Sequence, residues 1–278
     1  MKNLIKSLCP PLIFKLTKRY LKQDIRWVGN YPTFQEAQTQ CSGYDPDIYL
    51  NQLIKAVQIT QNDPTKCERD SIILDQVTYP YPLLNSLFAL AMKFRSQNLS
   101  IIDFGGSLGS LYFQNKKFLS LLPHFTWHIL EQEKIIQAGK TLFENQQLFF
   151  HQDIQELQNK LPPKSTKFLF LSGVLQYLEM PYQTLDSLIK SFEFDAILID
   201  RTSFSTNNTH QITIQKVPST IYSAQYPCHL FSKQELLASL TSAGYQLLDE
   251  FYSYCDTSTN QIDFLGFSLY KEKTCSKD

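Results

Sequence analysis

Short apolar runs alternate with segments of helical periodicity between residues 100 and 200. Each run suits a strand buried in a sheet, and the segments between them repeat their apolar positions every three to four residues, as helices that cover a sheet do. The pattern predicts strands at 100–104, 126–131, 148–151, 167–172 and 196–200, and helices at 111–122, 134–143, 155–160 and 182–192. This alternation predicts βαβ units, and therefore an α/β fold with a doubly wound, mostly parallel sheet.

The segments on either side of this region follow other patterns. Residues 1–98 read as a helical N-terminal extension that packs on or caps the core, with helices at 33–40, 48–61 and 82–97. Residues 99–278 form the main domain, interrupted by a polar and aromatic insert at 202–230. A helix at 233–243 follows, and two runs at 245–254 and 262–271 predict a closing antiparallel hairpin.

Composition narrows the class of protein. Apolar residues make up 43% of the chain, which is enough for a full core, and 26 basic residues balance 26 acidic ones. A neutral chain lacks the basic field that nucleic-acid binding requires, so we expect no nucleic-acid partner. The six cysteines form no C-x-x-C pair, which argues against a metal site and favours reduced thiols in a cytoplasmic protein.

The N-terminal segment 1–26 is basic and amphipathic. It carries seven Lys or Arg residues and one Asp, interleaved with Leu and Ile. Such a segment can rest weakly on the anionic inner face of a membrane. The alternative is a solvated helical arm packed on its own domain. No run approaches the ~20 apolar residues of a membrane span.

A glycine-rich turn follows the first predicted strand of the alternating region. Strand, glycine turn and helix together form a corner that suits nucleotide binding, although such a turn can be structural alone. Residues 103–109 resemble the first motif of class I S-adenosylmethionine-dependent methyltransferases, acidic-x-Gly-x-Gly-x-Gly, with Ser107 in place of the middle glycine. The resemblance implies cofactor contacts at Asp103, Phe104, Gly105, Gly106, Ser107 and Gly109. Gly-x-Gly-x-x-Gly is not satisfied, which disfavours a nicotinamide or flavin cofactor.

An acidic residue ends the second predicted strand of the alternating region, and another follows the third. Glu131 can accept hydrogen bonds from paired ribose hydroxyls, or it can cap the next helix, and Gln132 follows it. The resemblance places Asp153 and Ile154 against an adenine ring. The alternative for Asp153 is again a helix cap.

The segment 172–181 looks like the signature that follows the fourth strand in the same superfamily. The resemblance implies that Ser172 and Gly173 lie beneath the methionine part of the cofactor and that Tyr177 faces the transferred methyl group or the acceptor. The alternative is that the apolar residues of the segment only pack in the core. Five parallel strands, a helix and a closing hairpin also match the Rossmann-like, seven-stranded class I methyltransferase layout.

The whole of residues 26–270 resembles a narrower group, a bacterial family assigned as methyltransferases and associated with surface-polysaccharide (O-antigen) biosynthesis loci. Segments 68–71, 103–110, 131–132, 174–178, 199–202, 215–218, 226–228 and 231–233 carry this likeness. It implies S-adenosyl-L-methionine as cofactor and a small-molecule or saccharide acceptor. We keep two alternatives: a non-catalytic module that retains the fold, and a different nucleotide-using enzyme.

Methyl transfer to a hydroxyl requires a base near the acceptor. Asp200, predicted at the end of the fifth strand, and His229 are candidate bases, and Arg201 is a candidate partner for an anionic group on the acceptor. For Asp200 the alternative is a role in orienting Arg201, and for His229 a structural hydrogen bond. The insert 202–230 is a candidate lid that recognises the acceptor.

Overall fold

The structure is a computed structural model that describes residues 25–43, 46–218, 224–254 and 256–272. Residues 1–24 lie outside the described residues, so membrane contact of the basic N-terminus stays a prediction. The chain forms two compact units, residues 1–44 with 212–228, and residues 45–211 with 229–278. These boundaries differ from the predicted division at residue 98. In the described part of the chain, no helix has the length and apolar character needed to cross a membrane.

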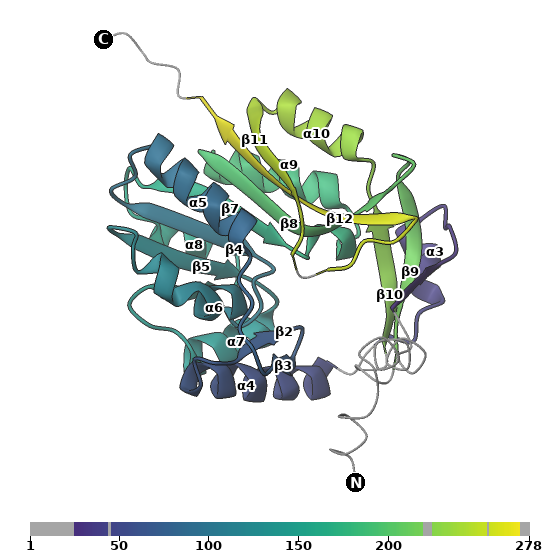
Figure 1. The fold of residues 1–278 in the computed structure, drawn as a ribbon, viewed down its shortest axis with the longest axis horizontal. Helices are drawn as coiled ribbons and strands as arrows, with labels where there is room; N and C mark the ends of the chain where they lie inside the picture. Colours follow the sequence, from purple (N-terminus) through teal and green to yellow (C-terminus); the bar gives the residue numbers. More distant parts are fainter. Residues whose placement is uncertain (1–24, 44–45, 219–223, 255, 273–278) are drawn as a thin grey trace, which may run out of the picture. The chain divides into compact units, whose positions relative to one another are not determined.

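A seven-stranded sheet forms the centre of the larger unit (Figure 1). Its strands, in spatial order, are β11 (Tyr245–Tyr252), β12 (Ile262–Lys271), β8 (Ala196–Ser205), β7 (Thr166–Ser172), β4 (Leu99–Phe104), β5 (Phe125–Leu130) and β6 (Leu148–His151). β4 pairs in parallel with both β5 and β7, whereas β12 pairs antiparallel with β8 and β11. This arrangement is the class I methyltransferase fold, so the predicted fold class is confirmed.

Helices cover both faces of the sheet. One core includes residues of α4 (Pro46–Asn62), α5 (Tyr81–Lys93), α6 (Ser110–Leu119) and α7 (Glu133–Leu142). The other core includes residues of α8 (Ile154–Lys160), the 3₁₀ helix η1 (Leu175–Tyr177), α9 (Pro181–Phe192) and α10 (Lys233–Ser242). Neighbouring residues such as Ile101 and Ile102 enter opposite cores. Burial on both faces explains why the strands read as continuous apolar runs.

Three expectations about this unit are wrong in detail. α5 ends at Lys93 instead of residue 97. β8 continues to Ser205 because β12 pairs with it beyond Asp200, where its pairing with β7 stops. The predicted helical extension also contains a hairpin of β2 (Cys67–Arg69) and β3 (Ile72–Leu74), whose strands have only three residues each and leave little periodic signal.

The smaller unit contains a three-stranded sheet and a helix. The strand order is β1 (Arg26–Val28), β9 (Gln211–Val217) and β10 (Ala224–Leu230). The predicted helix is confirmed as α3 (Phe34–Thr39), where Thr33 accepts a hydrogen bond from the backbone N–H of Glu36. The insert 202–230 is therefore not one long loop, since it contains β9 and β10. Its role as a lid stays a prediction.

Candidate functional site

The glycine turn, residues 103–109, joins β4 to α6. Gly105, Ser107 and Gly109 have φ values of 73°, 55° and 88°, in the left-handed region. A non-glycine residue pays about 1–2 kcal/mol for that conformation, so Ser107 stands at a position that suits glycine. A Cβ on Gly106 would lie 2.5 Å from the Asp103 carboxyl carbon. The backbone at Gly106 therefore packs closely against the Asp103 carboxyl.

The carboxyl of Asp103 packs against Gly106 of the turn. Its Oδ2 accepts a hydrogen bond from the Trp127 indole N–H at 3.0 Å, and its side chain is buried. Burial raises the pKa of Asp103 to about 7, although the Trp127 hydrogen bond acts in the opposite direction. The structure thus shows the Asp103 carboxyl packed between Trp127 and Gly106 of the turn, while its predicted cofactor contact stays a prediction.

Glu131 follows β5 on the same edge of the sheet. The β4–β5 register pairs Phe104 with Leu130, which brings the glycine turn and Glu131 together. The carboxylate accepts hydrogen bonds from the backbone N–H groups of Gln132, at 2.7 Å, and of Ser107. Burial raises the pKa of Glu131, and these two hydrogen bonds lower it. A carboxylate has about four acceptor positions, so two remain for a ligand.

The turn also contains an unsatisfied polar atom. The hydroxyl of Ser107 is buried and has no hydrogen-bond partner among the residues that the structure describes. Buried polar groups are nearly always paired in folded proteins, so each exception calls for a reason. A bound ligand with polar groups would satisfy it, which fits the expected cofactor.

The predicted adenine and methionine contacts follow β6 and β7, which β4 and β5 separate in the sheet. Asp153 accepts a hydrogen bond from the Glu156 backbone N–H at 2.8 Å and caps α8, and Ile154 packs against the core. The helix-cap interpretation of Asp153 is confirmed, and its contact with adenine stays a prediction. Ser172 ends β7, and Gly173 follows with φ 66°.

Five residues from distant segments form the β8 cluster, defined here as Asp70, Asp200, Arg201, Ser253 and Asp256. Arg201 Nε lies 2.9 Å from Asp256 Oδ2, and Arg201 Nη2 lies 2.9 Å from Asp70 Oδ2. The Arg201 guanidinium holds the pKa of Asp70 below its ordinary value. Arg201 therefore already has anionic partners within the chain, in contrast to its predicted pairing with an anionic acceptor.

Asp200 lies in the middle of β8 instead of at its end. Its Oδ1 accepts hydrogen bonds from Ser253 Oγ at 2.7 Å and from the Arg201 backbone N–H at 2.8 Å. Burial raises the pKa of Asp200, more than these donors and the Arg201 charge lower it. A carboxylate with a raised pKa is better suited to take up a proton, so Asp200 remains a candidate base.

Glu68 was not predicted as a site residue. It lies on β2, is 5% exposed, and accepts hydrogen bonds from the Ser110 hydroxyl and from the Ser71 backbone N–H. Burial raises the pKa of Glu68 to about 7. Asp70 and Ser71, at the hairpin turn, both have positive φ. This hairpin links the start of α6 with Arg201. Its sequence signals were the polar pair Asp70-Ser71 before the apolar run 72–74 and the resemblance of segment 68–71.

The two remaining catalytic candidates differ in exposure. Tyr177 is 37% exposed at the end of η1. His229 is buried, with Nδ1 2.9 Å from His210 Nε2 and Nε2 2.9 Å from the Leu178 carbonyl oxygen. A carbonyl only accepts, so His229 Nε2 carries the hydrogen and Nδ1 accepts from His210. Burial lowers the pKa of His229 to about 4, and this arrangement favours the structural interpretation over a catalytic base.

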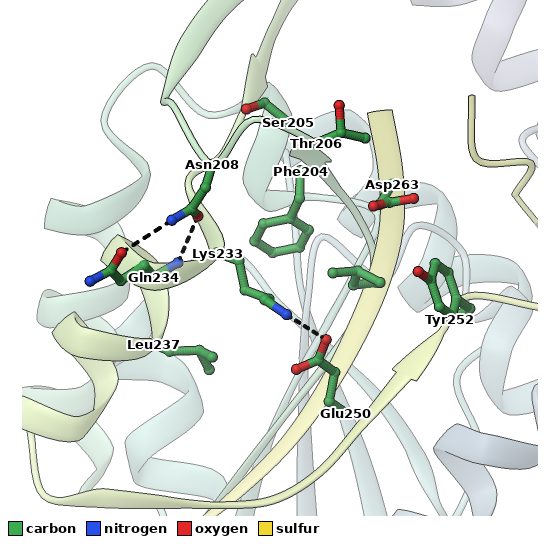
Figure 2. Close-up of a pocket in the computed structure, with 11 residues that line it drawn as sticks. Phe204, Ser205, Thr206, Asn208, Lys233, Gln234, Leu237, Glu250, Tyr252 and Asp263 are labelled. Carbon is green, nitrogen blue, oxygen red and sulfur yellow. Dashed lines mark hydrogen bonds and ion pairs between the residues drawn. The ribbon is translucent and has the colours of Figure 1, made fainter. Parts of the chain in front are cut away.

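A depression lies beside α10, the ends of β8 and β11 and the start of β12 (Figure 2). Lys233 pairs with Glu250 at 2.8 Å, and Asn208 accepts from the Gln234 backbone N–H at 3.1 Å. Figure 2 shows these side chains directed toward one another. Lys233, Glu250 and Asn208 in this depression thus pair with each other or with the backbone at the start of α10. We therefore place the candidate site at the glycine turn.

Comparisons with known proteins give a consistent set of structural neighbours. The chain resembles an S-adenosylmethionine-dependent methyltransferase from Clostridium acetobutylicum ATCC 824, at 9% identity and TM-score 0.45, over 70% of this chain and 93% of that one. It also resembles Burkholderia thailandensis 1,6-didemethyltoxoflavin-N1-methyltransferase, at 14% identity and TM-score 0.46, over 91% and 98% of the chains.

A third neighbour is the N-terminal domain of EvdMO1 in the presence of SAH and D-fucose, at 12% identity and TM-score 0.46, over 83% and 98% of the chains. No protein-family model matches the chain, and no curated protein matches it. Because these similarities are distant, we argue function from the chain's own residues.

Proposed function

We propose that the chain is an S-adenosylmethionine-dependent methyltransferase that acts on a small-molecule or glycan-intermediate acceptor. The observation that carries this proposal is the placement of the glycine turn and Glu131 on adjacent strand ends. β4 lies where the strand order reverses, with β5 and β6 on one side and β7 and β8 on the other. Ligands of open α/β sheets bind at this point, beyond the carboxyl ends of the strands.

The residues present suit this cofactor. The turn at Gly105 and Gly109 would receive its methionine part beside Gly173, and the Ser107 hydroxyl would gain a partner. The remaining acceptor positions of Glu131 would bind the ribose hydroxyls. When bound, the cofactor supplies an electrophilic methyl group.

The chain's own contribution is to align the acceptor, exclude water and remove a proton. Asp200 is the favoured proton acceptor, since it is 4% exposed, its pKa is raised, and Oδ1 alone has hydrogen-bond donors among the described residues. His229 is less suited to that role, because its Nδ1 accepts from His210 and its Nε2 donates to Leu178.

Titration calorimetry with S-adenosylmethionine and S-adenosylhomocysteine tests the proposal. We expect micromolar binding that weakens at least about tenfold, or about 1.4 kcal/mol, in Glu131→Gln. Glu133→Gln, two residues further along on the exposed surface of α7, is the matched control and should bind as the wild type does. A well-folded wild type that binds neither compound would overturn the proposal.

A role in surface-polysaccharide biosynthesis is the finer part of the proposal, and the sequence resemblance supports it. Release of S-adenosylhomocysteine in the presence of a saccharide acceptor would establish it. The alternative is a module that binds the cofactor without turnover, which the internal pairing of Arg201 favours. Tight cofactor binding with no methyl transfer to any acceptor would favour that alternative.

A further inference from the structure

The backbone of Arg201 is fixed from three directions. Its N–H lies 2.8 Å from Asp200 Oδ1 and 2.9 Å from Ser253 Oγ, and its carbonyl accepts from Gln176 Nε2 at 2.9 Å. Its φ of 53° is unusual for a residue inside a strand. Such a conformation persists only where the surroundings hold it, and it clusters at functional sites.

The guanidinium group is fixed as well. Asp256 accepts from Nε at 2.9 Å and Asp70 accepts from Nη2 at 2.9 Å, with a longer contact of 3.5 Å between Nη2 and Asp256 Oδ1. The Arg201 side chain is 22% exposed. Two carboxylates pair with one guanidinium, so Arg201, Asp70 and Asp256 together carry an excess of negative charge.

The third nitrogen, Nη1, has no partner among the described residues. It lies 3.7 Å from the position that a Cβ would take on Gly173. Gly173 follows β7, which pairs with β4, the strand that leads into the glycine turn. A Cβ on Gly173 would already be in van der Waals contact with Nη1, so the missing side chain leaves room beside this edge of the guanidinium.

Charge decides what Nη1 can bind. A phosphate or carboxylate placed there would gain a hydrogen bond from Arg201 but would meet Asp70 and Asp256 on the same guanidinium, which disfavours it. A hydroxyl or carbonyl oxygen accepts the same hydrogen bond without adding charge. The two aspartates thus select among ligands without touching them.

We propose that Arg201 determines acceptor specificity: its Nη1 binds a neutral hydroxyl or carbonyl oxygen of the acceptor, while Asp70 and Asp256 act as positioning residues that exclude anionic groups. This inference rests on the proposed function for its acceptor. The exclusion of anions, however, is a property of the chain itself and can be measured without cofactor or acceptor.

The test uses inorganic phosphate as probe, with binding to the full-length protein measured by calorimetry and by phosphorus NMR line width. We expect the wild type to bind phosphate only as a weak non-specific contact, with a Kd above about 10 mM. The double variant Asp70→Asn/Asp256→Asn keeps the shape of both partners and removes their charge, and should bind phosphate at least about tenfold more tightly. Adding Arg201→Gln to that variant should abolish the gain.

Two results would overturn the inference. One is phosphate binding by the wild type that Arg201→Gln removes, because the aspartates would then not close the site to anions. The other is a folded double variant, with a melting curve like that of the wild type, that still binds no phosphate. Titration with S-adenosylhomocysteine in the same samples separates this result from a failure of the proposed function, since either can fail while the other holds.

Discussion

The glycine turn and the β8 cluster both bring carboxylates to one end of the sheet, but they hold them with different partners. Asp103 and Glu131 receive hydrogen bonds from neutral donors, an indole N–H and backbone N–H groups, and burial raises the pKa of both. In the β8 cluster a guanidinium pairs with Asp70 and Asp256. The first region therefore retains acceptor capacity for ligand hydroxyls, while the second pairs its carboxylates with a cation of its own.

A clash within the glycine turn should have the largest effect. In Gly106→Ala the new Cβ would meet the Asp103 carboxyl, which the buried Trp127 holds in place, so the turn must shift. We expect the affinity for S-adenosylhomocysteine in calorimetry to fall at least about 100-fold, or about 2.7 kcal/mol.

Gly43→Ala is the control for that variant, because nothing lies within 4 Å of a Cβ on Gly43. Its φ of 69° imposes strain on the backbone, but no clash. We expect a lower melting temperature with unchanged cofactor affinity. Equal affinities for Gly106→Ala and the wild type would show that the turn does not contact the cofactor.

Glu68 connects the two regions, and its titration offers a second test. Its folded-state pKa of about 7 exceeds its ordinary value of 4.5, so the folded state binds the proton more tightly than the unfolded state. Stability should therefore fall as the pH rises from about 4.5 to about 7. Glu68→Gln mimics the protonated form, and should match the wild type below that range and exceed its free energy of unfolding by up to about 3 kcal/mol above it.

Urea unfolding at pH 5 and pH 8 measures this difference. Glu133→Gln, an exposed change on α7, is the matched control for the same charge removal. A Glu68→Gln protein that is less stable than the wild type at pH 8 would contradict the expected sign. In that case the charged carboxylate would stabilise the hairpin through its hydrogen bonds to Ser110 and Ser71.

The contrast between the two regions also explains what the sequence could predict. The strands were predicted because burial on both faces makes each one a continuous apolar run, and β6 and β12 begin and end at the predicted residues. The glycine turn is a local pattern, and Glu131 follows the adjacent strand. The β8 cluster has no local pattern, because Asp70 and Asp256 lie 131 and 55 residues from Arg201 along the chain.

The same reasoning accounts for the errors. Asp200 was placed at a strand end because the apolar run stops there, but pairing with β12 extends β8 through the polar residues that follow. The hairpin 67–74 was missed because strands of three residues give no periodicity. Both features depend on contacts between distant segments, which a pattern within one segment does not record.

Asp153 should show the smallest effect, and it separates a helix cap from a ligand contact at the edge of the glycine-turn region. Asp153→Ala removes the cap of α8 and should lower the free energy of unfolding by about 1 kcal/mol. Thr33→Ala removes the matching cap of α3 and should cost about the same. If Asp153 also contacts the adenine ring, Asp153→Ala alone should weaken S-adenosylhomocysteine binding, by about tenfold, or about 1.4 kcal/mol. Equal affinities in both variants would leave Asp153 with a structural role, because the carboxylate that accepts from Glu156 would then have no measurable share in holding the ligand.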